Sequence, residues 1–323
     1  MSKHPAILEV VQRVRTDVIG GAADTAKEIT TALATLIRDT DGSNPSSLAM
    51  VIEEAVTDIL RVTPSLAPPL NALHKVMGVL EEAQADSLSG GETRTSLLAA
   101  CESLLLVIAG ARDKVAQYGA EKIRDGDVVF TYSMSSTVWA VFLSAKARGK
   151  RFRVLVTESR PANEGMWTVD EMVKAGIDVG VSVDACIGEL VPQSDVVFVG
   201  ADAVSSHGTV LCKVGSYPTA LIAKAHGVPY YVAADTLKFD PTTLIGLPWK
   251  VEPIHRDEVL TKAYPDQVSV VGKVFDETPP ELITAVISEV GLLHPSACVT
   301  LMWQMKMSKK LNELLLKRSS GEI

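Results

Sequence analysis

Apolar residues recur at helical spacing through the first third of the chain. The spacing is three or four positions at Ile7, Val11, Val14 and Val18, and it resumes over residues 22–38 after Gly20-Gly21 interrupts it. Residues 46–63, 70–83 and 95–124 show the same pattern, with loops rich in proline, glycine and serine between them. No stretch before residue 125 has the pattern of a strand. The sequence therefore predicts a helical N-terminal domain over residues 1–124.

A different pattern begins at Asp125-Gly126, where short apolar runs alternate with helical stretches. The runs cover residues 128–131, 152–157, 179–183, 196–199, 230–233 and 268–271. Strands that alternate with helices indicate βαβ units, and unbroken runs of valine and phenylalanine are typical of strands buried on both faces. The predicted fold class is therefore α/β, with a mainly parallel sheet in a second domain over residues 125–323.

Composition and charge narrow the possible partners. The chain has 323 residues, enough for two domains, and 47% of them are hydrophobic but only 5% aromatic, so both cores should be aliphatic. The formal net charge is -8. A surface that coats nucleic acid needs clustered lysine and arginine, so this acidic chain is not expected to bind nucleic acid directly. One local basic pocket for a phosphate remains compatible with the charge.

The cysteines and the N-terminus are typical of an intracellular, cytoplasmic protein. The four cysteines are Cys101, Cys186, Cys212 and Cys298. None lies in a C-x-x-C pair, so free thiols are expected and a metal site is not. The first residues lead into an amphipathic stretch, which is not the pattern of a signal peptide. The most apolar run, 97–111, is too short for a bilayer and contains Glu102, so we expect a buried helix and no membrane partner.

Candidate chemistry lies just after the predicted strands, because open α/β sheets bind ligands at the carboxyl ends of their strands. The first run is followed by a serine-rich turn and then by a helix. In this turn Ser133, Ser135 and Ser136 place hydroxyls and backbone N–H groups at a helix N-terminus, which suits an anion. The alternative is simple helix capping, and the turn by itself favours capping.

Two charged residues follow the next strands at the same predicted edge. Arg160 comes after the second run and can grip a phosphate through two parallel hydrogen bonds. It can equally form a surface ion pair with Glu158 or Glu164. Asp202 follows the fourth run between small residues that leave room for a ligand. A carboxylate that accepts hydroxyl hydrogen bonds or moves a proton is therefore favoured there over a capping aspartate.

Two lysines complete the candidates found from the residues alone. Lys213 precedes a predicted helix start at Tyr217, and Lys238 follows the fifth run; either can contact a phosphate or be solvated. The histidines have no spaced carboxylate or cysteine partners, and the chain contains neither G-x-G-x-x-G nor a P-loop. No cofactor is therefore implied, and a dinucleotide or triphosphate bound in those modes is not expected.

Several segments, taken in order, carry a family resemblance. They are 152–161 (FRVLVTESRP), 199–202 (VGAD), 213–216 (KVGS) with 220–224 (ALIAK), 231–239 (YVAADTLKF) and 274–284 (VFDETPPELIT). They resemble a superfamily that holds the α, β and δ subunits of eukaryotic translation initiation factor two-B, archaeal ribose bisphosphate isomerase and methylthioribose phosphate isomerase. The resemblance runs nearly end to end. It implies a Rossmann-like second domain, homodimers formed through that domain, and higher assembly or pairing with related subunits in some members.

The resemblance also assigns site residues. The isomerases carry a catalytic cysteine, usually after histidine, where this chain has Ser133 after Tyr132. Their catalytic aspartate is matched by Asp202. The residues that keep the family pattern for ligand binding are Arg160, Asn71, Lys238 and Asp276.

Other family positions are changed. An I-R-G-A motif, whose arginine binds phosphate, has Gly20 and Gly21 at its centre here. A second arginine, before Pro64, is Thr63, and the asparagine before the F-D-x-T-P-P motif is Gly272. The changes thus fall on the thiol and on the phosphate contacts together.

Two functions from different classes stay open. The first is a non-catalytic or weakly catalytic protein that binds a phosphorylated small molecule, a sugar phosphate or a nucleotide, and acts through assembly with like subunits. The second is an aldose–ketose isomerase with a changed substrate, in which Asp202 is general acid or base and Ser133 donates to the carbonyl oxygen. A hydroxyl is a far weaker acid than a thiol, so the changes at the site slightly favour the first function.

Overall fold

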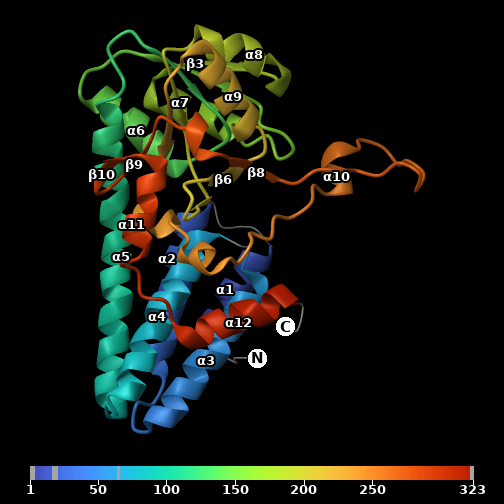
Figure 1. Cartoon of the computed structure of the whole chain (residues 1–323). Helices are drawn as coiled ribbons and strands as arrows, with labels where there is room; N and C mark the ends of the chain where they lie inside the picture. Colours follow the sequence, from blue (N-terminus) through green and yellow to red (C-terminus); the bar gives the residue numbers. More distant parts are fainter. Residues whose placement is uncertain (1–3, 17–20, 64–65, 321–323) are drawn as a thin grey trace. The chain divides into compact units, whose positions relative to one another are not determined.

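The computed structural model describes residues 4–16, 21–63 and 66–320, which divide into two compact units (Figure 1). The first, here called the helical unit, comprises Met1–Gly110, Leu237–Trp249 and Thr300–Ile323. The second, the sheet unit, comprises Ala111–Thr236 and Lys250–Val299.

The helical unit is an aliphatic helix bundle. Its helices are α1 (Pro5–Arg15), α2 (Ala22–Asp39), α3 (Pro45–Val62), α4 (Ala67–Ala85), the first part of α5 (Gly90–Ala120) and α12 (Lys309–Ser320), and it also holds η4 (Pro241–Ile245). Ile29, Leu33 and Ile37 recur every four residues along α2 and are fully buried. They pack in one core with Ile52 and Ile59 of α3. This aliphatic core agrees with the low aromatic content.

The division into units differs from the boundary that the sequence predicts at residue 125. That boundary marks the first strand, but α5 is one continuous helix that contributes to both units. Two later segments also belong to the helical unit. Leu311 and Leu315 of α12 are buried members of its core, and Leu247 packs against that core. Apolar contacts between residues that are far apart in the sequence leave no local pattern by which they could be predicted.

Helix α5 is buried on one face only. Leu97, Cys101 and Leu104 are buried, whereas Leu106 is 74% exposed. By length and composition alone, α5 is the one helix of the described ranges that could cross a membrane, and about a third of its most apolar window is buried. A core helix of a soluble protein passes the same test, so this is weak evidence for a membrane span. The buried helix predicted over 97–111 is confirmed only for one face.

The sheet unit contains two sheets. Its strands are β1 (Val128–Thr131), β2 (Arg153–Thr157), β3 (Asp178–Ser182), β4 (Val196–Val199), β5 (Ala203–Val204), β6 (Val210–Lys213), β7 (Tyr230–Ala233), β8 (Phe275–Thr278), β9 (Ala285–Ser288) and β10 (Gly291–Leu293). Its helices are α6 (Ser136–Ala147), α7 (Gly165–Ala175), α8 (Ile187–Leu190), α9 (Ser216–His226) and α10 (Arg256–Val259), and α11 (Cys298–Met302) follows the last strand.

The larger sheet has the strand order β10-β9-β7-β4-β1-β2-β3 in the described ranges. All its pairs are parallel except β9 with β10. Every residue of β4 is buried, as expected of a strand covered on both faces. The chain runs from β1 to β2 and β3 on one side and then to β4 on the other, so the order reverses at β1, where open α/β sheets form their ligand sites.

The smaller sheet, β5-β6-β8, is antiparallel and was not predicted. Five of the six predicted runs are strands, but residues 268–271 are not. Val271 is 83% exposed and lies in a loop, so the apolar run there has no sheet to join.

A buried histidine makes the stability of the helical unit depend on pH. His74 of α4 is 2% exposed, and its Nδ1 accepts the N–H of Ser308 at 3.2 Å. Burial lowers the pKa of His74 to about 4, although the charge of Glu81 opposes the shift. Glu81 accepts the N–H groups of Lys309 and Lys310 at the start of α12. The two helices are therefore joined through a histidine that must stay neutral.

Replacing His74 by asparagine should reduce the loss of folding stability that the wild type shows at acidic pH. In the wild type the unfolded chain binds the proton below pH 6.5 while the folded chain resists it until about pH 4, so stability falls as pH falls through this window. The loss should reach about 2 kcal/mol at pH 5 relative to pH 7.5. Urea unfolding of both proteins at the two pH values measures it. Equal losses in wild type and variant would contradict the assignment.

Candidate functional site

The turn after β1 fixes Ser133 in an unusual conformation. Its φ is 63°, in the left-handed region that residues with a Cβ seldom adopt. Its N–H donates to Ser159 Oγ at 2.8 Å, and its carbonyl accepts from Thr168 Oγ1 at 2.8 Å. Ser133 is 4% exposed. Both of its backbone polar groups are thus held by side chains from the β2–α7 segment, which sets the direction of its hydroxyl.

The Ser133 hydroxyl is the first member of a short polar chain. It donates to Oε2 of Glu164, the residue before α7. The other oxygen, Oε1, lies 2.8 Å from Nζ of Lys213 at the end of β6. The side chains of Lys213 and Glu164 are 12% and 16% exposed, and Lys213 Nζ lies 4.9 Å from the ring centroid of Phe275. Lys213, predicted to contact a phosphate, is therefore neutralised by an internal carboxylate.

Asp202 lies in the link between the two sheets. It follows β4, and its N–H donates to the carbonyl of Leu211 on β6 at 2.9 Å. Its side chain is partly exposed. Burial first, and then the charge of Asp202, raise the pKa of the Cys212 thiol to about 12. Asp202 is therefore placed at a strand end, as predicted, beside a thiol that stays protonated.

The start of α9 already holds an anion of the protein. The Asp276 carboxylate accepts the N–H of Gly215 at 2.7 Å and that of Tyr217 at 3.1 Å. Burial raises the pKa of Asp276 to about 6, although these hydrogen bonds act in the opposite direction. The predicted anion site at this helix start is thus occupied by Asp276 itself, and Asp276 is a carboxyl group that can exchange a proton near neutral pH.

Tyr132 packs inside the same group of turns. It is 3% exposed, and a Cβ added at Gly215 would lie 2.3 Å from its hydroxyl oxygen. Burial, and then the charges of Asp184 and Asp276, raise its pKa. Asp184 also accepts the backbone N–H groups of Ser159 and Arg160, each at 2.8 Å. The turns after β1, β2 and β3 are therefore connected to one another.

The Arg160 side chain extends toward α10. Its guanidinium donates to the carbonyl of Glu258, and the side chain is exposed. The predicted alternative, an ion pair with Glu158 or Glu164, is not what the structure shows, because Glu164 pairs with Lys213. The convergence of Arg160 with Asp202 on one ligand stays a prediction.

Ser135 and Ser136 begin helix α6. Ser135 is its N-cap, and its Oγ accepts the N–H of Val138 at 3.3 Å. A Cβ at Gly200 would lie 2.6 Å from that Oγ, so Ser135 packs closely against the end of β4. Ser136 is the first helical residue. The geometry thus favours the capping role, which leaves Ser133 as the serine of this turn that points to a charged partner.

The remaining predicted residues belong to the helical unit. Asn71 of α4 donates through Nδ2 to the carbonyls of Leu237 and Phe239 at 2.7 and 2.8 Å. It therefore holds the short helix η3 (Thr236–Lys238) rather than presenting a free amide. Lys238, the last residue of η3, is 6% exposed. Gly21 is the N-cap of α2 with φ 104°, and Gly20 lies outside the described residues.

The three buried thiols offer little reactivity. Burial raises the pKa values of Cys101 to about 11 and of Cys298 to about 12, as it does for Cys212. In the part of the chain that the structure describes, no group of three or more His, Cys, Asp or Glu side chains could hold a metal ion. The site therefore consists of hydroxyl, carboxylate and ammonium groups.

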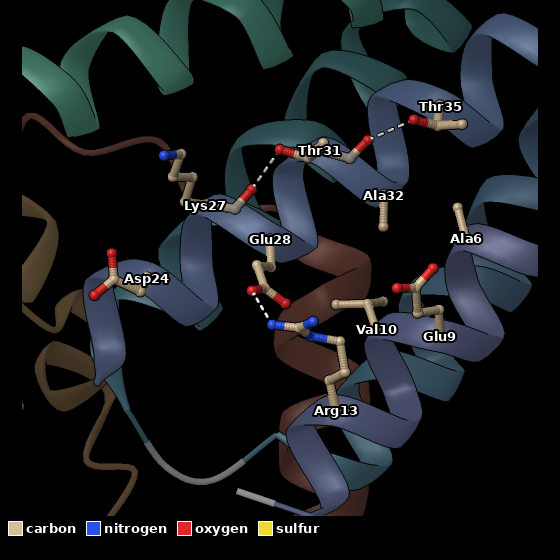
Figure 2. A pocket seen from close by; sticks show the side chains of 10 residues that line it. All are labelled: Ala6, Glu9, Val10, Arg13, Asp24, Lys27, Glu28, Thr31, Ala32 and Thr35. Carbon is tan, nitrogen blue, oxygen red and sulfur yellow. Dashed lines mark hydrogen bonds and ion pairs between the residues drawn. The ribbon is translucent and has the colours of Figure 1, made fainter. Parts of the chain in front are cut away.

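A separate groove lies between α1 and α2 of the helical unit (Figure 2). Its volume is about 550 Å³, and its lining alternates in charge with Glu9, Arg13, Asp24, Lys27 and Glu28. Arg13 pairs with Glu28 across it at 2.7 Å. None of the predicted site residues lines this groove.

These features define the class of protein to which the chain belongs. It combines a helical unit with an open, mostly parallel α/β sheet, and polar groups gather at the ends of the strands. The chain belongs to the initiation factor 2 subunit family, whose model matches residues 18–295. This confirms the superfamily resemblance and the fold class predicted from the sequence.

Relatives in this family carry two kinds of name. Ribose 1,5-bisphosphate isomerase of Thermococcus kodakarensis is 28% identical over 312 residues, which cover 94% of this chain and 97% of that protein. A Pyrococcus horikoshii protein named as translation initiation factor eIF-2B subunit 2-like is 32% identical over 289 residues, 90% of this chain and 96% of that protein. The crystal structure of translation initiation factor eIF-2B from Pyrococcus horikoshii matches with a TM-score of 0.76 and 30% identity, covering 91% of this chain and 99% of that one.

Sequence reasoning missed the residues that connect the turns. Glu164 was considered only as a surface partner of Arg160, and Ser159, Thr168 and Asp184 were not considered. Ser159 lies in the 152–161 segment that carries the resemblance, and Glu164 and Thr168 follow within seven residues of it, which is the signal that could have directed attention to these three. Their partners lie more than twenty residues away, so the contacts themselves were not readable.

The two glycines that flank α9 test the packing of Tyr132. Gly215 has φ 110°, and a Cβ there would clash with the Tyr132 ring, so Gly215→Ala should cost about 3 kcal/mol through strain and overpacking. Gly227, at the other end of the helix, has φ 69° but open space around it, so Gly227→Ala should cost only about 1 kcal/mol. Urea unfolding of the full chain measures both. Equal costs would show that the Tyr132 contact is not tight.

Proposed function

We propose that this chain is an aldose–ketose isomerase whose substrate is a phosphorylated ribose, of the type named for the Thermococcus kodakarensis relative. The name ribose 1,5-bisphosphate isomerase predominates among the relatives found. The observation that carries the proposal is the placement of Ser133, a buried hydroxyl held at a strand end and hydrogen-bonded to a carboxylate. A residue retained only for packing would not need a charged partner there.

The reaction class explains why two groups are needed. Interconversion of an aldose and a ketose moves one hydrogen between neighbouring carbons and one proton between their oxygens. A positioned carboxylate can take and return the carbon-bound proton, which is the role proposed for Asp202. A hydroxyl that exchanges its own proton can serve the oxygens, which is the role proposed for Ser133.

One basic residue of the sheet unit supports a phosphate on the substrate. Arg160 presents an exposed guanidinium after β2, and a guanidinium can hold a phosphate through two parallel hydrogen bonds. Because Lys213 is already paired, we infer that the substrate has fewer phosphate contacts than one that uses all the family positions.

A second candidate is a non-catalytic member that binds the sugar phosphate and acts through assembly. The relative from Pyrococcus horikoshii with the initiation-factor name is the more identical of the two relatives compared above. Tyr132, Ser133 and Gly272 all depart from the isomerase pattern. Binding without turnover would favour this candidate.

Turnover of ribose 1,5-bisphosphate, followed by NMR, tests the proposed function. Asp202→Asn should lower kcat at least about 100-fold, because it removes the general acid–base group. Ser133→Ala should also lower kcat, whereas Ser133→Cys should keep or raise it, since a thiol is the stronger acid. Asp178→Asn, at the amino end of β3, is the matched control and should change nothing.

The outcomes separate the two candidates. The second candidate would replace the first if the wild type bound these ligands in calorimetry but turned over neither ribose 1,5-bisphosphate nor methylthioribose 1-phosphate. Turnover that Asp202→Asn leaves intact would remove Asp202 from the mechanism.

We also propose that the chain forms a homodimer through the sheet unit. Helix α7 exposes apolar side chains, with Trp167 50% and Val173 62% exposed, and such side chains favour a protein partner. Val173→Asp should convert a dimer to a monomer in sedimentation equilibrium, because an unpaired charge in an interface is costly. A monomeric wild type, or a variant that stays dimeric, would contradict this placement of the interface.

A further inference from the structure

A serine hydroxyl needs help to exchange protons. At its free pKa it is a weak acid and a weak nucleophile, and enzymes activate it with an adjacent base. The structure places one carboxylate against the Ser133 hydroxyl, that of Glu164. A partner that acts on Ser133 must be held in place by contacts of its own, unlike a solvated surface neighbour.

Three contacts fix Glu164. Lys213 holds Oε1 at 2.8 Å, and both side chains are more than four-fifths buried. The next residue, Gly165, donates its N–H to the carbonyl of Glu158 at 3.1 Å. A Cβ at Gly165 would lie 1.8 Å from the carbonyl oxygen of Thr157, so the backbone after Glu164 lies directly against the end of β2. A solvated ion pair would have none of this support.

Lys213 is fixed in turn. It ends β6, in register with Phe275 of β8, and its Nζ lies 4.9 Å from the centroid of that ring. A cation over an aromatic ring is attracted to its face. Ser133, Glu164 and Lys213 therefore come from three separate segments, and each is held by backbone or ring contacts of its own.

We propose that Glu164 is the proton acceptor of the Ser133 hydroxyl and that Lys213 positions Glu164 and keeps it charged. The proposal rests on the isomerase function argued above. Ser133 Oγ takes the proton of the hydroxyl on one sugar carbon while its own proton passes to Glu164 Oε2. The same path returns a proton to the oxygen on the neighbouring carbon, and Asp202 moves the carbon-bound hydrogen. Each group ends in its starting state, so no other reactant is consumed.

This arrangement accounts for a serine at a position where the isomerases of the family carry a thiol. A free thiol has a pKa of about 8.5, whereas a hydroxyl is a far weaker acid. Glu164 would supply the basicity that the side chain at position 133 lacks. Removing Glu164 should therefore harm the serine enzyme far more than a cysteine variant of it.

A thiol titration tests the proton coupling without any substrate. The ultraviolet absorbance of the thiolate in Ser133→Cys, with the wild type subtracted, gives the pKa at position 133, since the other cysteines are common to both. Adding Glu164→Gln should lower that pKa by about one unit or more, because a neighbouring negative charge is removed. Glu171→Gln, which breaks an exposed α7 ion pair with Lys174, is the matched control and should leave the pKa unchanged. An unchanged pKa in the Glu164→Gln background would overturn the proposal.

Kinetics test the relay in the reaction. Glu164→Gln should lower kcat about 100-fold with KM within about threefold, whereas in the Ser133→Cys background the same change should cost less than about threefold. Equal losses in both backgrounds would overturn the relay and assign Glu164 a structural role. A wild type without turnover would refute the proposed function, and the thiol titration would still decide the coupling on its own. Melting temperatures of all variants identify any that fail to fold.

Discussion

The left-handed backbone at Ser133 is the constraint on which the site depends. A non-glycine residue in this region costs about 1–3 kcal/mol and persists where its neighbours determine it. Here the hydroxyls of Ser159 and Thr168 take up the N–H and the carbonyl of Ser133. With the opposite sign of φ, the hydroxyl would leave Glu164, and the connection from β1 through the β2–α7 turn to β6 would be broken. The strained backbone of the turn therefore holds the Ser133 hydroxyl in the position that the proposed chemistry requires.

Carboxylates of the sheet unit accept hydrogen bonds from its own N–H groups and pair with one of its own cations. Asp276 accepts the first N–H groups of α9, Asp184 accepts those of Ser159 and Arg160, and Glu164 neutralises Lys213. These internal carboxylates already use N–H groups and a cation that a phosphorylated ligand could otherwise contact. In the sequence, two arginines that the family resemblance implies are likewise replaced, by Gly20 and Thr63. We therefore expect a site that keeps acid–base groups but makes fewer contacts to phosphate.

Local pattern predicted much of the fold but only part of the site. Residues 196–199 could be recognised as a strand because burial on both faces leaves a continuous apolar run. The same rule failed at 268–271, which lie in a loop where Val271 is exposed. The capping role of Ser135 was readable from the turn, since it involves residues three apart. The pairing of Glu164 with Lys213 was not, because antiparallel β6 brings Lys213 back from a distant segment. For the same reason the sequence did not indicate that Leu237–Trp249 and Thr300–Ile323 belong to the helical unit.

The central claim is that Ser133 and Asp202 face one sugar phosphate. A crystal structure of the Asp202→Asn variant soaked with ribose 1,5-bisphosphate tests it most directly. The account predicts a sugar whose two reacting carbons or their oxygens lie within about 3 Å of Ser133 Oγ and of the side chain at position 202. A sugar bound with either side chain turned away from those atoms, or bound only in the groove between α1 and α2, would contradict it.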